Sequence, residues 1–208
     1  AINNVSHAIP TRTTSKILEG ILVEIKEREM LLTATDTTIT IEAMTAVSSD
    51  EERSFVVPAR LFSSIISKLP EEEVMIEYDG EKEKIKIRSG NSSSELISFS
   101  SDEFPKIKVS ETNNKIPLSK DTVRKLIRKT SFAASPDELN GILTGVLLEI
   151  KDKEFRMVAV DSFRMAINNA PVENNSELSV VIPAKLINEV SKIISDDGDD
   201  SMSLEITD

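Results

Sequence analysis

The chain has 208 residues, of which 39% are hydrophobic and 29% charged, so it suits one or two soluble globular domains. It has no apolar run near the ~20 residues that a membrane span needs, no visible signal peptide and no cysteine for disulfides, thiolate metal sites or a nucleophile. We therefore expect a cytoplasmic protein. The net charge of −11 argues, as an average, against a nucleic-acid binder, whose footprint is usually basic.

The first part of the chain predicts strands interrupted by helices. A helix is expected at the start, and the apolar–polar alternation of residues 21–26 predicts a strand. Residues 37–42 are rich in β-branched side chains and predict another strand. Pro58 suits the first turn of a helix, which we expect over 59–69. The apolar face of this helix would hold Leu61, Phe62, Ile65 and Ile66.

Two more strands are expected over 84–88 and 93–99, and a linker over about 101–115. The second part of the chain then opens with a helix. Ser119 is the expected N-cap of this helix, and Asp121 in its first turn favours the helix dipole. The apolar stripe of the helix, at helical spacing, consists of Val123, Leu126 and Ile127.

An internal repeat organises the whole chain. Residues 17–36 align with 142–161 without a gap at an offset of 125, and ten of the twenty positions are identical. The same offset pairs 55–61 with 180–186, and it holds upstream for Ile2, Ser6 and Ala8 against Ile127, Ser131 and Ala133. Because this unit is far longer than a solenoid repeat of ~20–50 residues, it indicates a duplicated domain. The predicted class is α+β, with two helices on antiparallel sheet in each copy.

The repeat also predicts the extent of each copy. We expect a first domain over 1–115, including the linker, and a second over 116–208. Ala1 aligns with Leu126, inside the first helix of the second copy, so the first copy is expected to lack its opening residues. The second copy reaches only the counterpart of the strand around Glu77 and is expected to lack its closing strands.

The predicted helices carry positive charge against the trend of the chain. The windows 58–69, 119–130 and 183–194 have net charges of +2, +4 and +1, so the remainder carries −18. In the middle window, like charges stand four residues apart at Arg124 and Arg128, which costs roughly 0.2–0.5 kcal/mol in an isolated helix. A solvated helix face explains one such helix, but three of them in an acidic chain favour contact with a polyanion. No base-reading motif is visible, so the contact would be sequence-neutral attraction to duplex phosphates.

The order of the sequence motifs resembles the bacterial DNA polymerase III beta subunit, the sliding clamp family, over the whole chain. The motifs that carry the resemblance are Arg12-Thr13-Thr14, 32–36 (LTATD), 57–59 (VPA), 102–105 (DEFP), 142–145 (ILTG) and 159–166 (AVDSFRMA). The resemblance implies three such domains per chain, of which the third is not in this sequence. It also implies a head-to-tail homodimeric ring that encircles duplex DNA without catalysis and without a cofactor.

Site residues follow from the resemblance together with the helix charges. The DNA-contacting residues would be Arg12, Arg60, Lys68, Lys120, Arg124, Lys125, Arg128, Lys129, Lys185 and Lys192. A groove on the second domain would bind short apolar peptides of the replicative polymerase, the clamp loader and repair proteins. Its residues would be Leu143, Val160, Ser162, Phe163, Arg164, Met165, Pro183 and Ile187.

The groove sequence departs from the common Thr-Asp-Gly-His-Arg-Leu run of the family. Val160 stands for Thr, Ser162-Phe163 for Gly-His, and Met165 for Leu. These changes predict a more apolar and differently shaped pocket. Read without the resemblance, Leu143 and Met165 would be ordinary core residues.

Catalysis finds little support in the sequence. His7, the only histidine, is expected in a partly buried structural role. Asp36 and Asp161 are repeat equivalents that follow strands, and we interpret them as turn-forming residues. The acidic run 196–200 misses the EF-hand spacing and is interpreted as a solvated hairpin loop. The sequence contains no glycine-rich phosphate loop and no nucleophile elbow.

Two other functions stay open at this level. One is a protein-binding scaffold whose duplicated domains have no role on DNA. The other is a metal-dependent hydrolase that uses Asp36 or Asp161.

Overall fold

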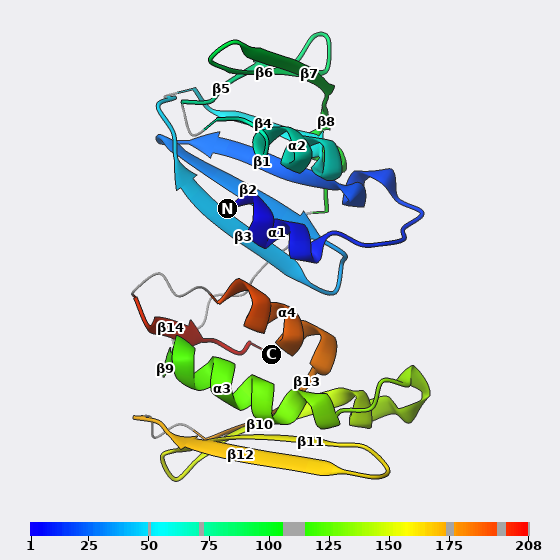
Figure 1. The fold of residues 1–208 in the computed structure, drawn as a ribbon, viewed down its shortest axis with the longest axis vertical. Coiled ribbons are helices and arrows are strands. Elements are labelled where there is room, and N and C mark those ends of the chain that lie inside the picture. Colours follow the sequence, from blue (N-terminus) through cyan, green and yellow to red (C-terminus); the bar gives the residue numbers. More distant parts are fainter. Residues whose placement is uncertain (50, 71–72, 106–114, 174–176, 195–198, 208) are drawn as a thin grey trace. The chain divides into compact units, whose positions relative to one another are not determined.

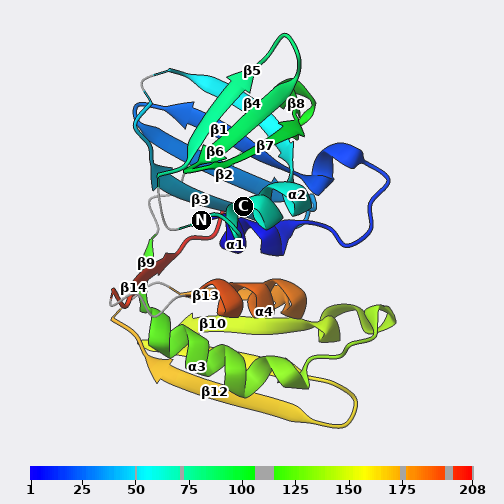
Figure 2. The same cartoon turned by 45° about the horizontal axis from the view of Figure 1, so that its top comes forward.

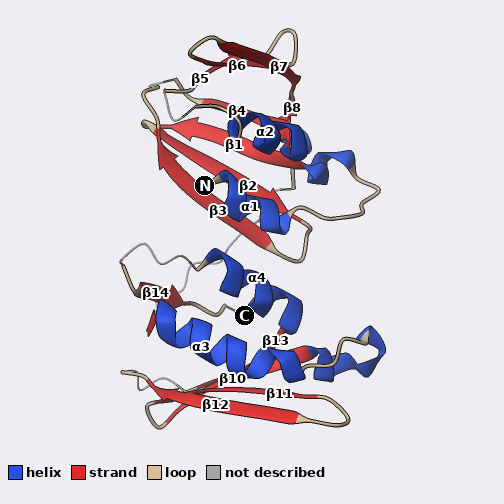
Figure 3. Ribbon diagram, in the orientation of Figure 1, coloured by secondary structure: helices blue, strands red, loops and turns tan. Residues whose placement is uncertain are grey.

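The computed structural model describes residues 1–49, 51–70, 73–105, 115–173, 177–194 and 199–207. The chain divides into two compact units, Ala1–Ile107 and Lys108–Asp208, and each is described by itself. Both units combine antiparallel strands with a few helices (Figure 3), which confirms the predicted α+β class. Within the described ranges, no helix is long and apolar enough to cross a membrane.

The first unit is built around a five-stranded sheet of order β3-β2-β1-β4-β8, beside a three-stranded sheet of order β5-β6-β7 (Figure 2). Its strands are β1 Gly20–Lys26, β2 Glu29–Thr35, β3 Thr40–Ala46, β4 Arg53–Pro58, β5 Met75–Asp79, β6 Lys84–Ser89, β7 Ser92–Ile97 and β8 Phe99–Ser100. Its helices are α1 Ile2–Val5, α2 Ala59–Ile66 and the 3-10 turns η1 Ser6–Ala8, η2 Lys16–Glu19 and η3 Ser101–Glu103.

The second unit has a four-stranded sheet of order β12-β11-β10-β13 and a separate strand pair of order β14-β9. Its strands are β9 Ile116–Ser119, β10 Gly145–Lys151, β11 Glu154–Val160, β12 Met165–Pro171, β13 Leu178–Pro183 and β14 Ser201–Leu204. Its helices are α3 Lys120–Thr130, α4 Ala184–Ile193 and the 3-10 turns η4 Ser131–Ala133 and η5 Glu138–Thr144.

The two units repeat the same strand register at the offset seen in the sequence. Gly20 faces Pro58 across β1 and β4, as Gly145 faces Pro183 across β10 and β13. A Cβ on Gly20 would lie 2.4 Å from a methyl carbon of Val56, and the same distance separates a Cβ on Gly145 from Val181. Each central strand therefore needs glycine at its first position for the neighbouring strand to approach.

The central hairpins also share a strained turn. Glu27 and Arg28 both have positive φ, as do Asp152 and Lys153 in the second unit. Positive φ at both loop residues is typical of type I′ turns, whose twist matches the flanking strands. Because a two-residue loop fixes the pairing of its strands, it also fixes which side chains point to each face of the sheet.

The helices of each unit cover one face of its sheet, which we call the inner face, and leave an outer face (Figures 1 and 2). In the second unit, the predicted stripe of Val123, Leu126 and Ile127 is buried on α3, as expected, against the inner-face residues of β10 and β11. In the first unit, α1 and α2 lie over Met30 and Leu32 on the inner face.

Several expected boundaries shift. The helix expected over 59–69 ends at Ile66, and Leu61 is 55% exposed, so it does not share the buried face of Phe62. The strand expected from residue 37 begins at Thr40, because Thr37 has positive φ in a turn bound by the Asp36 side chain. His7 is exposed on a 3-10 turn rather than partly buried.

The end of the acidic run has a structural role that the sequence reading missed. Residues 196–198 lie outside the described residues, but Asp200 binds the start of α3. The Ser119 hydroxyl donates to Asp200 Oδ2 (2.5 Å), and the Asp121 amide donates to Asp200 Oδ1 (2.8 Å). The Ser119 hydroxyl also accepts from the Thr122 amide (3.2 Å), as an N-cap does. The hydrogen bond from the Ser119 hydroxyl, and after it the one from the Asp121 amide, holds the pKa of Asp200 below its usual value.

We predict that Ser119→Ala destabilises the second unit by about 1 kcal/mol, the usual cost of losing an N-cap side chain. Amide hydrogen exchange at the first turn of α3 should accelerate in parallel. Denaturant unfolding followed by circular dichroism, together with exchange mass spectrometry, would measure both. Ser203→Ala, at an exposed serine of β14, is the matched control and should leave both unchanged. Equal stability of the two variants would contradict the capping role.

Candidate DNA-contacting helices and peptide-binding surface

The exposed basic residues of α3, which are Lys125, Arg128 and Lys129, lie on the side away from its buried stripe. Arg128 and Lys129 are exposed and, within the described part of the chain, form no ion pair. Lys125 pairs with Asp121 one turn earlier. These positions give α3 a cationic surface whose last turn is available to an external anion, where positive charge also suits the helix dipole.

Arg124 differs from the other basic residues of α3. It is only partly exposed, and its Nη2 donates to the carbonyl oxygen of Ile194 at 3.0 Å. Ile194 is the C-cap of α4, so Arg124 joins the two helices that lie side by side on the inner face (Figures 1 and 2). Arg124 therefore positions α4 in addition to adding charge.

The remaining predicted DNA-contacting residues lie on several elements. Lys120 is half-buried in the first turn of α3, and Lys185 is exposed in the first turn of α4. Lys192, in the last turn of α4, pairs with Glu189 at 2.8 Å. In the first unit, Arg60 is exposed at the start of α2, next to the loop of Pro10 and Thr11 that leads to Arg12. Lys68 is exposed just beyond the end of α2.

The predicted groove residues of the second unit gather around the β11–β12 turn. Val160 pairs with Met165 across the two strands, and Met165 is 62% exposed. Ser162 and Phe163 form the exposed turn between them. The guanidinium of Arg164 lies 5.6 Å from the ring centre of Phe132, within range of a cation–π contact.

Three further groove residues have different surroundings. Leu143 is half-buried in η5, where its carbonyl oxygen accepts from the Ser135 amide at 2.8 Å. Pro183 is exposed at the end of β13. Ile187 is only 6% exposed and belongs to the core under α4. Its side chain is covered because the apolar side of α4 turns toward the sheet, and its part in the groove stays a prediction.

The structure adds an apolar row on the outer face that the sequence reading missed. Val181 pairs with Leu147, Leu147 with Val158, and Val158 with Ile167, so one row crosses all four strands. Val181 and Ile167 are exposed, and Met165 lies on the same face of β12 by strand alternation. The alternation of inward and outward side chains along β13 could have indicated that Val181 faces outward. Only the strand register shows that Val181, Leu147, Val158 and Ile167 form one row.

Asp161 holds the turn that presents Phe163 and Arg164. Its Oδ1 accepts from the amides of Phe163 (2.8 Å) and Arg164 (2.9 Å), and its Oδ2 accepts from Arg164 Nε (3.0 Å). These contacts, led by the Phe163 amide, lower the pKa of Asp161. Asp36 accepts from the amides of Thr38 and Ile39 in the same way. The predicted turn-forming role of both aspartates is confirmed.

Neither aspartate belongs to a cluster of potential ligands. In the ranges described above, no three histidine, aspartate or glutamate side chains are grouped as metal ligands are.

We predict that the β11–β12 turn loosens in acid. Because the folded pKa of Asp161 is lowered, its stabilising contribution is fully present above the unfolded value of about 3.9. It is lost as the pH falls through the lower folded pKa. Carbon-13 NMR of the carboxyl group should give a midpoint below that of an ordinary aspartate. Asp161→Asn should remove the accompanying pH dependence of the Phe163 amide shift, and a titration of that amide unchanged in the variant would contradict this role.

Comparison with known proteins identifies the family. The sequence profile described as DNA polymerase III beta subunit, N-terminal domain, matches residues 1–108, and that of the central domain matches residues 117–208. The chain belongs to the DNA polymerase III beta subunit family. The predicted resemblance is thereby confirmed, and the internal repeat corresponds to the two matched domains of the family.

Individual relatives agree with this assignment. The Beta sliding clamp of Halalkalibacterium halodurans is 35% identical across 99% of this chain and 57% of its own length. That of Staphylococcus aureus is 35% identical across 96% of this chain and 55% of its own length. This chain of the beta subunit family therefore spans little more than half the length of these curated relatives.

Solved structures of the family have the same fold. The crystal structure of a DNA polymerase III beta subunit from Eubacterium rectale matches with a TM-score of 0.93 at 35% identity, over 99% of this chain and 56% of that one. The DNA polymerase sliding clamp of Bacillus subtilis matches with a TM-score of 0.91 at 33% identity, over 100% of this chain and 57% of that one.

Proposed function

We propose that this chain provides the first two domains of a DNA sliding clamp, a ring that encircles duplex DNA and tethers the replicative polymerase without catalysing a reaction itself. The domains extend over 1–115 and 116–208, and a third completes each subunit of a head-to-tail homodimer, which works at the nucleoid in the cytoplasm. The observation that carries the proposal is the basic face of α3, exposed at Arg128 and Lys129 in a chain of net charge −11.

The distribution of charge supports sliding rather than sequence recognition. Lysine and arginine attract phosphates of any sequence, and such contacts let a protein move along the duplex. The carboxylates outside the helices give the rest of the surface the opposite sign, which discourages DNA from binding there. Arg12 and Arg60 of the first unit would add to the phosphate contacts of α3 and α4.

The exposed apolar residues around the β11–β12 turn support the second part of the proposal. Met165 and Phe163 offer apolar area beside the cation of Arg164, and short apolar peptides of the polymerase, the clamp loader and repair proteins would bind there. Apolar anchors of this kind dominate binding energy when a partner covers them. Tethering at this surface would keep an enzyme on the DNA that the ring encloses.

Retention on circular DNA tests encirclement. We expect the complete protein, loaded by its clamp loader onto a nicked circle, to stay bound and to be lost when the circle is linearised. The double variant Arg128→Glu/Lys129→Glu should load poorly and dissociate sooner. The control Lys151→Glu/Lys153→Glu has the same charge change at exposed hairpin residues and should behave as the unaltered protein. In direct DNA binding, the α3 variant should reduce the salt slope by about two.

Equal loss from circles and linear DNA would contradict encirclement. Equal behaviour of the two charge variants would contradict the role of α3. If circular and linear DNA lose the protein equally and the two charge variants also behave alike, the protein-binding scaffold is favoured.

Peptide binding tests the tethering surface. Met165→Ala should weaken binding of a short apolar peptide of the replicative polymerase by about tenfold, or ~1.4 kcal/mol. Leu139→Ala is the matched control, because Leu139 is an apolar residue of the same unit that is 92% exposed but outside the predicted groove. Fluorescence anisotropy would measure both affinities. The same affinity for the two variants would contradict the proposed surface.

A further inference from the structure

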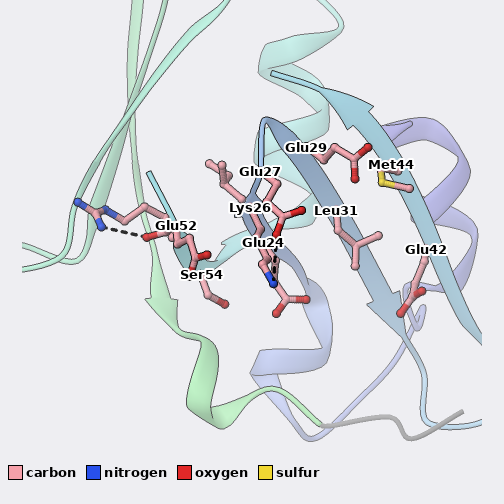
Figure 4. Close-up of a pocket in the computed structure, with 11 residues that line it drawn as sticks. Glu24, Lys26, Glu27, Glu29, Leu31, Glu42, Met44, Glu52 and Ser54 are labelled. Carbon is pink, nitrogen blue, oxygen red and sulfur yellow. Dashed lines mark hydrogen bonds and ion pairs between the residues drawn. The ribbon is translucent and has the colours of Figure 1, made fainter. Parts of the chain in front are cut away.

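The outer face of the first unit carries a hollow of about 680 Å³ that the proposed function does not use (Figure 4). It lies across strands β1, β2, β3 and β4, on the face opposite α1 and α2. It is lined by Glu24, Ile25, Lys26, Glu27, Glu29, Leu31, Glu42, Met44, Glu52, Arg53 and Ser54.

The floor of this hollow is apolar and its rim is acidic. Glu24 pairs with Leu31 across β1 and β2, and Leu31 pairs with Met44 across β2 and β3. Met44 is 61% exposed and lies on β3, the edge strand of the sheet. Glu42 is two residues from Met44 on β3 and therefore lies on the same face, so carboxylates flank the two apolar side chains (Figure 4).

The chain itself neutralises only a small part of the acidic rim. The hollow has two cations: Arg53 pairs at 2.8 Å with Glu51, which does not line the hollow, and Lys26 lies 3.7 Å from the lining residue Glu27. Among the described residues, the remaining rim carboxylates form no ion pair. These are Glu24, Glu29, Glu42 and Glu52.

In the second unit, the carboxylates at the equivalent positions of the sheet have ion-pair and hydrogen-bond partners within the chain. At the repeat offset, Arg156 stands where the first unit has Leu31, and Asn169 stands where it has Met44. Arg156 pairs with Glu149 at 3.2 Å and with Glu154 at 3.4 Å, and Asn169 Nδ2 donates to Glu154 at 3.0 Å.

The glutamates are therefore common to both copies, while their neutralising partners are not. Glu149 and Glu154 are the counterparts of Glu24 and Glu29. In the second copy a central arginine satisfies both, so the fold does not require uncompensated carboxylates at these positions. In the first copy an apolar floor replaces the arginine. Repulsion of DNA alone would explain the carboxylates but not exposed Met44 among them.

We propose that this hollow is a docking surface for a basic, amphipathic segment of a partner protein. One apolar side chain of the segment would cover Leu31 and Met44, and lysine or arginine on either side of it would meet the carboxylates of Glu24, Glu29 and Glu42. Apolar contact at the centre with charge pairs at the rim is the usual anatomy of a specific interface, and complementary charge adds specificity and association rate. The hollow lies on the face of the first unit opposite α1 and α2, whereas the β11–β12 turn belongs to the second unit.

The exchange of residues between the two units tests this proposal. The probe is the synthetic peptide Lys-Ser-Leu-Ser-Lys-Ser-Leu-Ser-Lys, which places leucine and lysine on one face of an extended chain. It should shift the NMR signals of β1 to β3 in the unaltered protein, and added salt should weaken its binding. Peptides with glutamate for lysine, or serine for leucine, should not bind.

Leu31→Arg/Met44→Asn gives the first unit the residues that pair with the carboxylates in the second unit. The sheet of the second unit, which has the same register, already accommodates them. It should weaken peptide binding by about tenfold or more. The reciprocal variant Arg156→Leu/Asn169→Met should create a second binding surface, seen as new shifts in β10 to β12. Unchanged affinity in the first variant, or no shifts in β1 to β3 of the unaltered protein, would overturn the proposal.

Discussion

Burial of one apolar stripe of α3 against the sheet decides where the positive charge of this protein lies. Val123, Leu126 and Ile127 each contribute roughly 1.5–3 kcal/mol when removed from water. The like-charge neighbours on the exposed side, such as Lys125 and Lys129, cost only about 0.2–0.5 kcal/mol per pair. Burial therefore fixes the orientation of the helix, because it contributes more free energy than the repulsion between the exposed cations costs.

Hydrogen bonds at the ends of the helices add to the hold that burial provides. Ser119 and Asp200 bind the amides at the start of α3, and Arg124 binds the carbonyl at the end of α4. The contacts of Asp200 and Arg124 join segments that are far apart in the sequence. Asp161 acts locally and holds the turn that carries Phe163.

Duplication has given the molecule two sheets of the same register with different outer faces. In the second unit, an apolar row from Val181 to Ile167 lies beside a polar row neutralised by Arg156. In the first unit, Leu31 occupies the place of that arginine, and its neighbouring carboxylates form no ion pair among the described residues. The inner faces, which pack helices in both units, kept their apolar pattern, because core packing tolerates fewer changes than an exposed sheet face.

The sequence by itself determined the duplication, the α+β class, the buried stripe of α3 and the concentration of positive charge on helices. These follow from local periodicity and from an ungapped offset, which need no knowledge of contacts. Its errors fall where contacts join residues that are distant in the sequence: Leu61 faces solvent, and Asp200, assigned to a solvated loop, binds the start of α3. Only the tertiary structure decided these, because helix orientation and strand register join residues that sequence spacing cannot relate. The register likewise assembled the row from Val181 to Ile167 and the acidic hollow around Leu31, since a cross-strand neighbour is set by backbone hydrogen bonds between segments and not by proximity along the chain.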